Sequence, residues 1–285
     1  MKKLTWIHLL LIFLSAKLAL HGYVNGLWSF HRDELLYLAL GRHLDWGFAS
    51  VPPGIGFWAW FGDAVLGGSV EAIRLIASIF GTATVLLIAL MAREMAPKSE
   101  GKFAAVLVGL SGLLCGASLR TSMLFMPVVF DIFYWTLLCW LFLKYINTQQ
   151  TNWLLYFGLA AGFGLLNKYS VLIFLFAMLP GLLFSPQRAL FLKKELYWAA
   201  GLALLVFSPN IAWQAAHHFP VFRHMSELAA TQFVHVELGG FFADHFSREK
   251  CAREGRVNAI RWRDGSERRQ QARFCSGVLR EYRRG

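Results

Sequence analysis

Residues 6–37 read WIHLLLIFLSAKLALHGYVNGLWSFHRDELLY, and this stretch decides the fold class. Its apolar part is long enough to cross a bilayer as a helix and ends near Val24. Two adjacent carboxylates, Asp33 and Glu34, follow a few residues later. Charged groups beside a hydrophobic span cost solvation free energy unless they stay hydrated or find partners, so this pair marks a candidate functional site next to the membrane.

The composition indicates that membrane-spanning segments make up most of the chain. Hydrophobic residues make up 56% and aromatic residues 15% of the chain, and the mean hydropathy is +0.47, as expected for a polytopic membrane protein. The apolar stretch 55–66 is too short to span and is predicted to form an interfacial helix in the first outer loop. We predict an all-α transmembrane helix bundle of about seven spans, at residues 4–26, 71–92, 103–119, 130–146, 152–167, 169–185 and 196–213.

The basic residues predict the orientation of the bundle. With a cytoplasmic N-terminus, the inner loops carry nine Lys and Arg residues. The longer outer segments then carry six, namely Arg32, Arg42, Arg74, Arg120, Lys168 and Arg223. The positive-inside rule therefore places the first loop, with its acidic pair, on the outer face.

The N-terminal run leaves two alternatives open. Lys17 interrupts the run, and its side chain either snorkels toward the headgroups or faces the bundle interior. The run could also be a cleavable signal peptide, although no convincing small-x-small cleavage site follows it.

Composition changes abruptly near Phe246, which divides the chain into a transmembrane module, 1–246, and a tail, 247–285. The tail carries 12 Lys and Arg against 5 Asp and Glu, whereas the module carries 16 and 12. The tail is a basic arm for anionic lipid, a disordered polar segment, or the product of an out-of-frame reading. Its aromatic residues are too sparse to stack on bases, so no nucleic-acid partner is expected.

The sequence contains no cofactor motif. The four cysteines form neither a CxxC nor a Cys/His cluster with metal-ligand spacing, and neither a Walker motif nor a GxGxxG after a strand occurs. We therefore expect no cofactor and leave a divalent cation open.

The acidic pair has a functional and a structural interpretation. Neighbouring residues on a helix point about 100° apart, so Asp33 and Glu34 cannot form a dyad with one shared proton. One of them is expected to face a cavity while the other supports it. Asp33 is either a general base for an acceptor hydroxyl or a cap or first-turn residue of a helix over residues 35–43.

In the predicted topology, cations and a further carboxylate reach the same outer face. Lys168 either snorkels to the headgroups or binds a lipid-linked phosphate. Arg120 either binds the same phosphate or caps the third span. Asp131 either caps the fourth span or contacts substrate.

Several motifs in this order resemble the GT-C superfamily of membrane glycosyltransferases. The resemblance is to the branch that holds protein O-mannosyltransferases, the lipid A aminoarabinose transferase and bacterial glycosyltransferase 39-like proteins. It covers residues 20–246 and is most specific over 32–53. The matching segments are 32–38 (RDELLYL), 41–48 (GRHLDWGF), Pro52-Pro53, 73–75 (IRL), Met126-Pro127 with Phe130-Asp131 and Trp135, 164–169 (GLLNKY), Ser208-Pro209-Asn210, Trp213-Gln214 and His217.

This resemblance implies a sugar transfer with inversion, from a polyprenyl-phosphate donor to a hydroxyl of a lipid, glycan or protein acceptor. The reaction would take place at the periplasmic face of a bacterial inner membrane, with little or no need for a metal. Asp33 would be the base and Glu34 would orient it or touch the acceptor. The residues assigned to substrate binding are Lys168, Tyr169, Arg120, Asp131, His43 and Pro53.

The chain departs from the family pattern at three places. Val51 stands where a His often precedes the two prolines, and Asn167 replaces a small residue before the lysine. After Phe246 the resemblance ends, which predicts a C-terminally truncated member. The alternatives to a transferase are a lipid-linked sugar flippase and a catalytically inert relic.

Overall fold

The computed structural model describes residues 5–231, and these residues form helices and no β-strand. The chain divides into two units at His224, and the first unit holds all of the features discussed below. The elements are α1 (Trp6–Val24), α2 (Arg32–Arg42), α3 (Gly54–Ala64), α4 (Val70–Met95), α5 (Gly101–Leu114), α6 (Gly116–Met123), α7 (Pro127–Thr148), α8 (Asn152–Asn167), α9 (Ser170–Leu183), the 3-10 helix η1 (Pro186–Leu192), α10 (Lys194–Ala216) and α11 (Pro220–Thr231).

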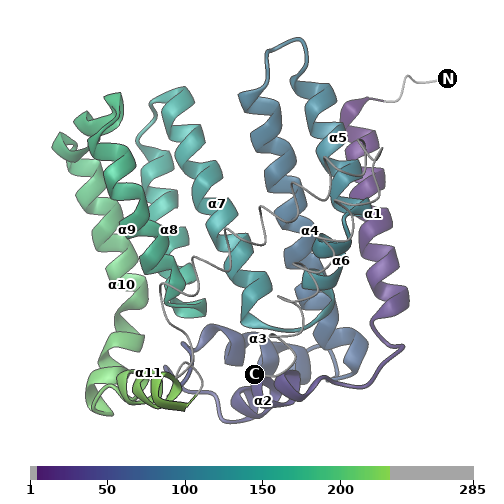
Figure 1. Ribbon diagram of the computed structural model, residues 1–285, viewed down its shortest axis with the longest axis vertical. Helices are drawn as coiled ribbons and strands as arrows, with labels where there is room; N and C mark the ends of the chain where they lie inside the picture. The colour runs from purple at the N-terminus through teal and green to yellow at the C-terminus, as the bar shows by residue number, and fades with distance from the viewer. Residues whose placement is uncertain (1–4, 232–285) are drawn as a thin grey trace, which may run out of the picture. The chain divides into compact units, whose positions relative to one another are not determined.

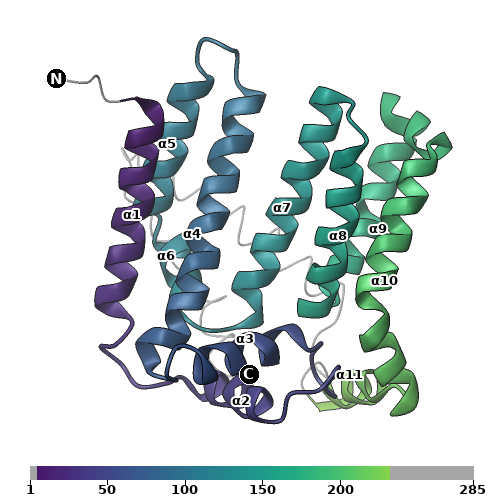
Figure 2. The same ribbon diagram turned by 180° about the vertical axis from the view of Figure 1, so that it is seen from behind.

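The long helices of the first unit stand side by side, and two short helices lie across one end of them. Figures 1 and 2 show α1, α4, α7, α8 and α10 with their axes roughly aligned, and α2 and α3 beneath their lower ends. The loops that the predicted topology assigns to the outer face therefore do gather at one end of the bundle.

The all-α bundle is confirmed, whereas the count of seven spans stays a prediction. Within residues 5–231, four helices are long and apolar enough to cross a membrane, namely α1, α4, α7 and α10, and up to six spans result if two bent helix pairs each count as one. The fifth predicted span corresponds to α8, whose 16 residues extend about 24 Å and fall short of a hydrocarbon core of about 30 Å.

The third predicted span, 103–119, is broken. It bends by 63° between α5 and α6, at Cys115, where the backbone is extended. The sixth predicted span, 169–185, corresponds to α9 and ends where the chain bends by 114° into η1, just before Pro186. Proline cannot continue the hydrogen bonding of a preceding helix, which explains this second bend.

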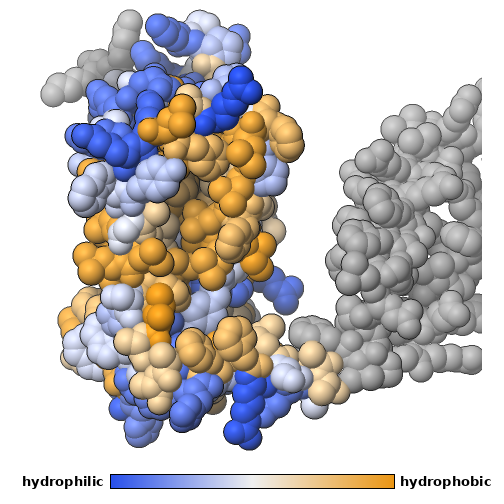
Figure 3. All heavy atoms as spheres, turned by 90° about the vertical axis from the view of Figure 1, so that its left-hand side faces the viewer, coloured by the Kyte–Doolittle hydropathy of each residue, from blue (hydrophilic) through white to orange (hydrophobic). Residues whose placement is uncertain are grey.

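The surface of the bundle supports a membrane location. On the side that carries α9 and α10, apolar residues form a band between hydrophilic residues at the two ends (Figure 3). Large apolar side chains of α9 and α10 are exposed, including Ile173, Phe176 and Leu205. An exposed apolar surface of this kind is stable against lipid tails and unstable in water.

The first outer loop folds as two short helices. The apolar stretch at 55–66 forms α3, so its helical structure is confirmed, while its place in the membrane interface stays a prediction. The helix predicted over 35–43 begins earlier, at Arg32, because the side chain of His31 accepts a hydrogen bond from the Asp33 amide and caps it. Asp33 lies in its first turn, as one of the two alternatives expected.

Lys17 faces the interior of the bundle and does not snorkel. Its side chain is fully buried, and its Nζ atom lies 3.0 Å from His21 Nε2 and 3.1 Å from Ser122 Oγ. These contacts join α1 to α6. The predicted boundary near Phe246 and the tail 247–285 lie outside the described residues.

Glycine allows α8 and α10 to approach closely. A Cβ atom on Gly158 would lie 2.2 Å from the carbonyl oxygen of Ala199, which is far inside contact distance. By contrast, a Cβ atom on Gly201 in α10 would meet nothing within 4 Å. Small residues at helix contacts are the usual means of close packing inside membranes.

We predict that Gly158→Ala lowers the stability of the bundle by about 1–3 kcal/mol, because the added methyl group forces the two helices apart. Thermal unfolding of the detergent-solubilised chain measures the effect. Gly201→Ala is the matched control and should leave the melting temperature unchanged or raise it slightly. Equal destabilisation by the two substitutions would show that the α8–α10 contact is not the cause.

Candidate functional site

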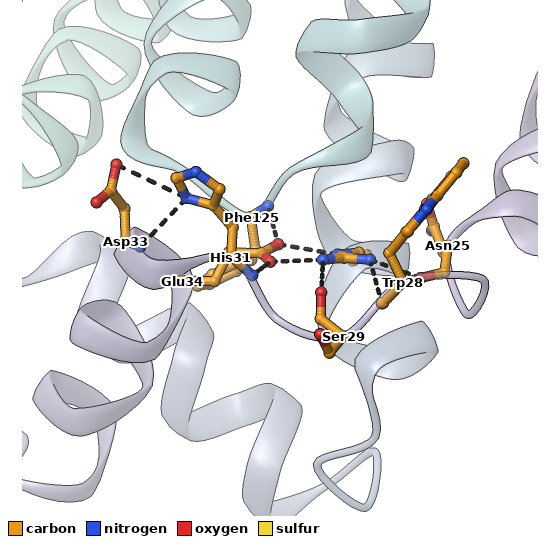
Figure 4. Close-up of polar contacts among 8 residues, drawn as sticks. Asn25, Trp28, Ser29, His31, Asp33, Glu34 and Phe125 are labelled. Carbon is orange, nitrogen blue, oxygen red and sulfur yellow. Dashed lines mark hydrogen bonds and ion pairs between the residues drawn. The ribbon is translucent and has the colours of Figure 1, made fainter.

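The acidic pair separates into one buried and one exposed carboxylate. Glu34 is fully buried and lies against Arg74 of α4, itself buried, with Nε–Oε1 and Nη2–Oε2 distances of 3.0 and 2.7 Å. The amides of Phe125 and His31 also donate to the two carboxylate oxygens, at 2.8 and 2.7 Å. Figure 4 shows these contacts and shows Asp33 pointing away from them.

Arg74 uses all of its donors. Nη1 donates to the carbonyl oxygens of Asn25 and Trp28, and Nη2 donates to that of Ser29, at 2.7–3.0 Å. Together with the two bonds to Glu34, the five N–H groups of the guanidinium are satisfied. The pair therefore ties the segment between α1 and α2 to α4, and through Phe125 to the loop between α6 and α7.

The charge state of Glu34 follows from these contacts. Burial by itself raises the pKa of the carboxyl, but the hydrogen bonds from Arg74, Phe125 and His31 outweigh it and hold the pKa below its usual range. Glu34 is therefore ionised at neutral pH and its lone pairs are already engaged. This geometry suits a positioning residue better than a group that touches substrate.

Asp33 has the opposite surroundings. Its side chain is 40% exposed, and its Oδ1 accepts a hydrogen bond from Arg32 Nε at 3.2 Å. Its Oδ2 lies 3.8 Å from His31 Nδ1, which already accepts from the Asp33 amide and so carries no proton to share. Burial and the Asp33 charge raise the pKa of the nearby Tyr37 phenol, which stays protonated. Asp33 thus retains an oxygen that can accept a proton.

Lys168 and Asp131 form a second charged group at the same end of the bundle. Lys168 Nζ lies 3.6 Å from Asp131 Oδ2, and the hydroxyl of Ser170 donates to Asp131 Oδ1 at 2.6 Å. The lysine side chain is 43% exposed while the aspartate is nearly buried at 11%. The Lys168 ammonium is therefore accessible to an anionic group from solvent while it stays close to the Asp131 carboxylate.

A polar cluster fixes the first outer loop against α10. Tyr169 donates to Asn210 Oδ1 at 3.0 Å and accepts from Gln214 Nε2 at 3.1 Å. The amide of Asn210 in turn donates to the carbonyl oxygen of Trp46, at 2.8 Å. These bonds hold the Tyr169 phenol against α10, and its predicted contact with substrate stays a prediction.

A cavity of about 550 Å³ lies between this loop and the ends of α7 and α8. Its walls are mostly aromatic and aliphatic, with Asp45 and Asn167 as polar members. The lining residues are Leu44, Asp45, Trp46, Pro53, Gly54, Phe57, Trp58, Tyr134, Phe163, Leu166 and Asn167. A second cavity, of about 490 Å³, includes Asp131 in its wall. Both have the size of ordinary small-molecule sites.

The other predicted site residues lie apart from these groups. Arg120 is exposed on the last turn of α6, and no contact among the described residues joins it to Lys168 or Asp33. His43 is exposed and ends α2, while Pro53 is buried and lines the first cavity. Arg74 was predicted to lie in an outer segment, but it is buried within α4.

A comparison with known families now identifies the chain's relatives. The pattern of the dolichyl-phosphate-mannose-protein mannosyltransferase family matches residues 50–213, which is more than half of the chain. The chain belongs to this family. The predicted GT-C resemblance is thereby confirmed. The matched residues include Lys168 and Asp131, whereas Asp33 and Glu34 precede them.

A curated relative of the chain is also named as a glycosyltransferase. The lipid A galacturonosyltransferase RgtD of Rhizobium johnstonii is 26% identical over 224 residues, which cover 76% of this chain and 46% of that protein. The chain thus spans a little under half the length of this relative. No solved structure gives a significant match.

We predict that Glu34→Gln lowers stability at pH 7 by about 3–5 kcal/mol, because it leaves the buried Arg74 without its counter-charge. A group with a depressed folded-state pKa contributes stability above its unfolded pKa and loses it as the pH falls through the folded value. The difference between the two proteins should therefore shrink below about pH 4.5. Melting curves from pH 7 to pH 3 measure it, and a constant difference would contradict the ion-pair interpretation.

Proposed function

We propose that this chain is a membrane glycosyltransferase that moves a sugar from a polyprenyl-phosphate donor to an acceptor hydroxyl. Membership of the mannosyltransferase family carries the proposal and favours it over a flippase. We assign the reaction to the periplasmic face of a bacterial inner membrane. The acceptor is a lipid, a glycan or a protein.

The proposed reaction is a single displacement with inversion. The acceptor oxygen attacks the anomeric carbon as its proton passes to Asp33, and the bond from that carbon to the phosphate oxygen breaks. The electron pair of that bond remains on the phosphate, which leaves as the polyprenyl phosphate. This step needs one base and a cation near the phosphate, and both kinds of group are exposed at one end of the bundle.

Asp33 is the proposed base because its exposed carboxylate keeps an oxygen, Oδ2, that accepts no hydrogen bond from the described residues. Glu34 cannot take this role without leaving Arg74 unpaired. It instead sets the start of α2, because it accepts from the His31 amide one residue before the helix. Glu34 is therefore assigned a positioning role.

Lys168 is the proposed phosphate ligand. Its ammonium is accessible, and its distance of 3.6 Å from Asp131 leaves hydrogen-bonding capacity for an incoming anion. Charge that develops on the leaving phosphate would be stabilised by this cation. Arg120 has no comparable placement, and its proposed contact with phosphate receives no support from the contacts described above.

We expect Asp33→Asn to lower turnover by roughly 10²- to 10⁴-fold while the affinity for the carrier lipid stays nearly constant, since only the proton acceptor is lost. Transfer from a radiolabelled polyprenyl-phosphate sugar in membrane vesicles measures the turnover, and a carrier-binding assay measures the affinity for the carrier lipid. Asp63→Asn is the control, because Asp63 is also exposed and pairs with an arginine, Arg42, at 3.8 Å. Loss of binding with normal residual turnover would exclude the base role, and a wild-type chain without turnover would favour the inert relic.

We expect Lys168→Ala to weaken carrier-phosphate binding by about tenfold or more, because it removes a charge-assisted contact. Lys144→Ala is a matched control, since Lys144 forms a lysine–carboxylate pair with Glu94 at 2.9 Å near the far end of α7. The test compares apparent KM values for the carrier. An unchanged KM in Lys168→Ala would remove Lys168 from the phosphate site.

A further inference from the structure

The cavity beside the first outer loop has a wall chemistry that selects among sugars. Trp46 and Trp58 contribute indole rings to it, and Tyr134 contributes a phenol. Aromatic faces stack on the C–H face of a pyranose ring, and a few polar groups at the rim then select the hydroxyl pattern. The cavity also adjoins Asn167, the residue directly before Lys168 in the chain.

The formal charge on the lining of this cavity is negative. Among the described residues that line it, Asp45 is the only one with a formal charge, and no Lys or Arg side chain is present to balance an anionic ligand. One carboxylate oxygen of Asp45 accepts a hydrogen bond from the Trp46 amide at 2.7 Å, while the other accepts none from the described residues. The available oxygen can therefore accept from a hydroxyl or an ammonium group.

We infer that this cavity holds the sugar ring of a substrate, and that Asp45 makes it select neutral or amino sugars and reject uronic acids. This inference rests on the proposed function. A uronate would bring a second carboxylate into a cavity whose lining holds Asp45 and no Lys or Arg, and like charges repel. A hydrocarbon tail would bury the Asp45 carboxylate without a hydrogen bond, which is also unfavourable.

The inference separates this chain from its relative. That protein is named for the transfer of galacturonate, a sugar that carries a carboxylate. A cavity whose lining carries a carboxylate as its formal charge does not suit such a sugar. We therefore assign Asp45 as a specificity-determining residue for a different sugar class.

The test uses the full chain in nanodiscs and four probes: farnesyl phosphate, and farnesyl phosphate linked to glucose, glucosamine or glucuronate. We expect glucosamine and glucose to bind at least about tenfold more tightly than glucuronate. Asp45→Asn should remove most of this difference, and Asp63→Asn should preserve it. Binding of the methyl glycosides of the same three sugars, measured with farnesyl phosphate at saturation, shows whether the preference belongs to a separate acceptor sugar. A preference for either the donor sugar or the acceptor sugar supports the cavity assignment.

Two outcomes would overturn the inference. The first is equal or tighter binding of glucuronate by the wild-type chain. The second is an Asp45→Asn variant that changes the affinity for farnesyl phosphate as much as for the linked sugars, which would place the isoprenoid tail in the cavity. If farnesyl phosphate itself fails to bind, the proposed phosphate site is wrong instead, and the methyl glycoside arm alone then decides the sugar preference. A melting curve confirms that each variant is folded.

Discussion

The ion pair between Glu34 and Arg74 is the interaction on which the outer end of this bundle depends. A carboxylate and a guanidinium removed from water are stable only if their remaining lone pairs and protons find partners. Here Glu34 accepts four hydrogen bonds and Arg74 donates five. The pair and its partners come from residues 25–34, from α4 and from the loop before α7. One buried pair thus joins three segments that are distant in sequence.

This constraint gives the adjacent carboxylates different roles. Because Glu34 is held on the inner side of α2, its neighbour must leave the helix in another direction, toward solvent. The family to which the chain belongs is named for a lipid-phosphate sugar, dolichyl-phosphate-mannose. An exposed carboxylate and an accessible lysine at the same end of the bundle fit the chemistry of such a donor. Rigid support beneath Asp33 also fits a base that must be held in a defined place.

A second cluster of buried polar groups, deeper in the bundle, is also stabilised by hydrogen bonds between its members. Lys17 is fully buried, and its ammonium lies within hydrogen-bonding distance of His21, Ser122 and the carbonyl oxygen of Ser118. Ser122 in turn accepts from Ser78, which accepts from Asn25, the residue whose carbonyl oxygen binds Arg74. Hydrogen bonds therefore run from the middle of α1 to the acidic pair, and they provide partners for the buried side chains of Lys17, His21, Ser78 and Ser122.

Much of this arrangement could be predicted from the sequence, and the exceptions have physical causes. Apolar length predicted α4 and α10 closely, because span length is set by bilayer thickness. The breaks at Cys115 and before Pro186 depend on local backbone geometry that hydropathy does not report. The burial of Arg74 was missed because its partner lies 40 residues away, and a charge count along the chain cannot pair them. The different roles of Asp33 and Glu34 were expected in kind, but only the fold decides which one is buried.

Hydrogen–deuterium exchange of the wild-type chain and Arg74→Gln in the same detergent tests most directly whether the buried pair organises the outer end. If it does, amides of residues 25–40 and 123–127 should exchange faster in the variant, while α8 and α10 keep their protection. Unchanged exchange in residues 25–40, or an equal increase in every helix, would contradict that role for the Glu34–Arg74 pair.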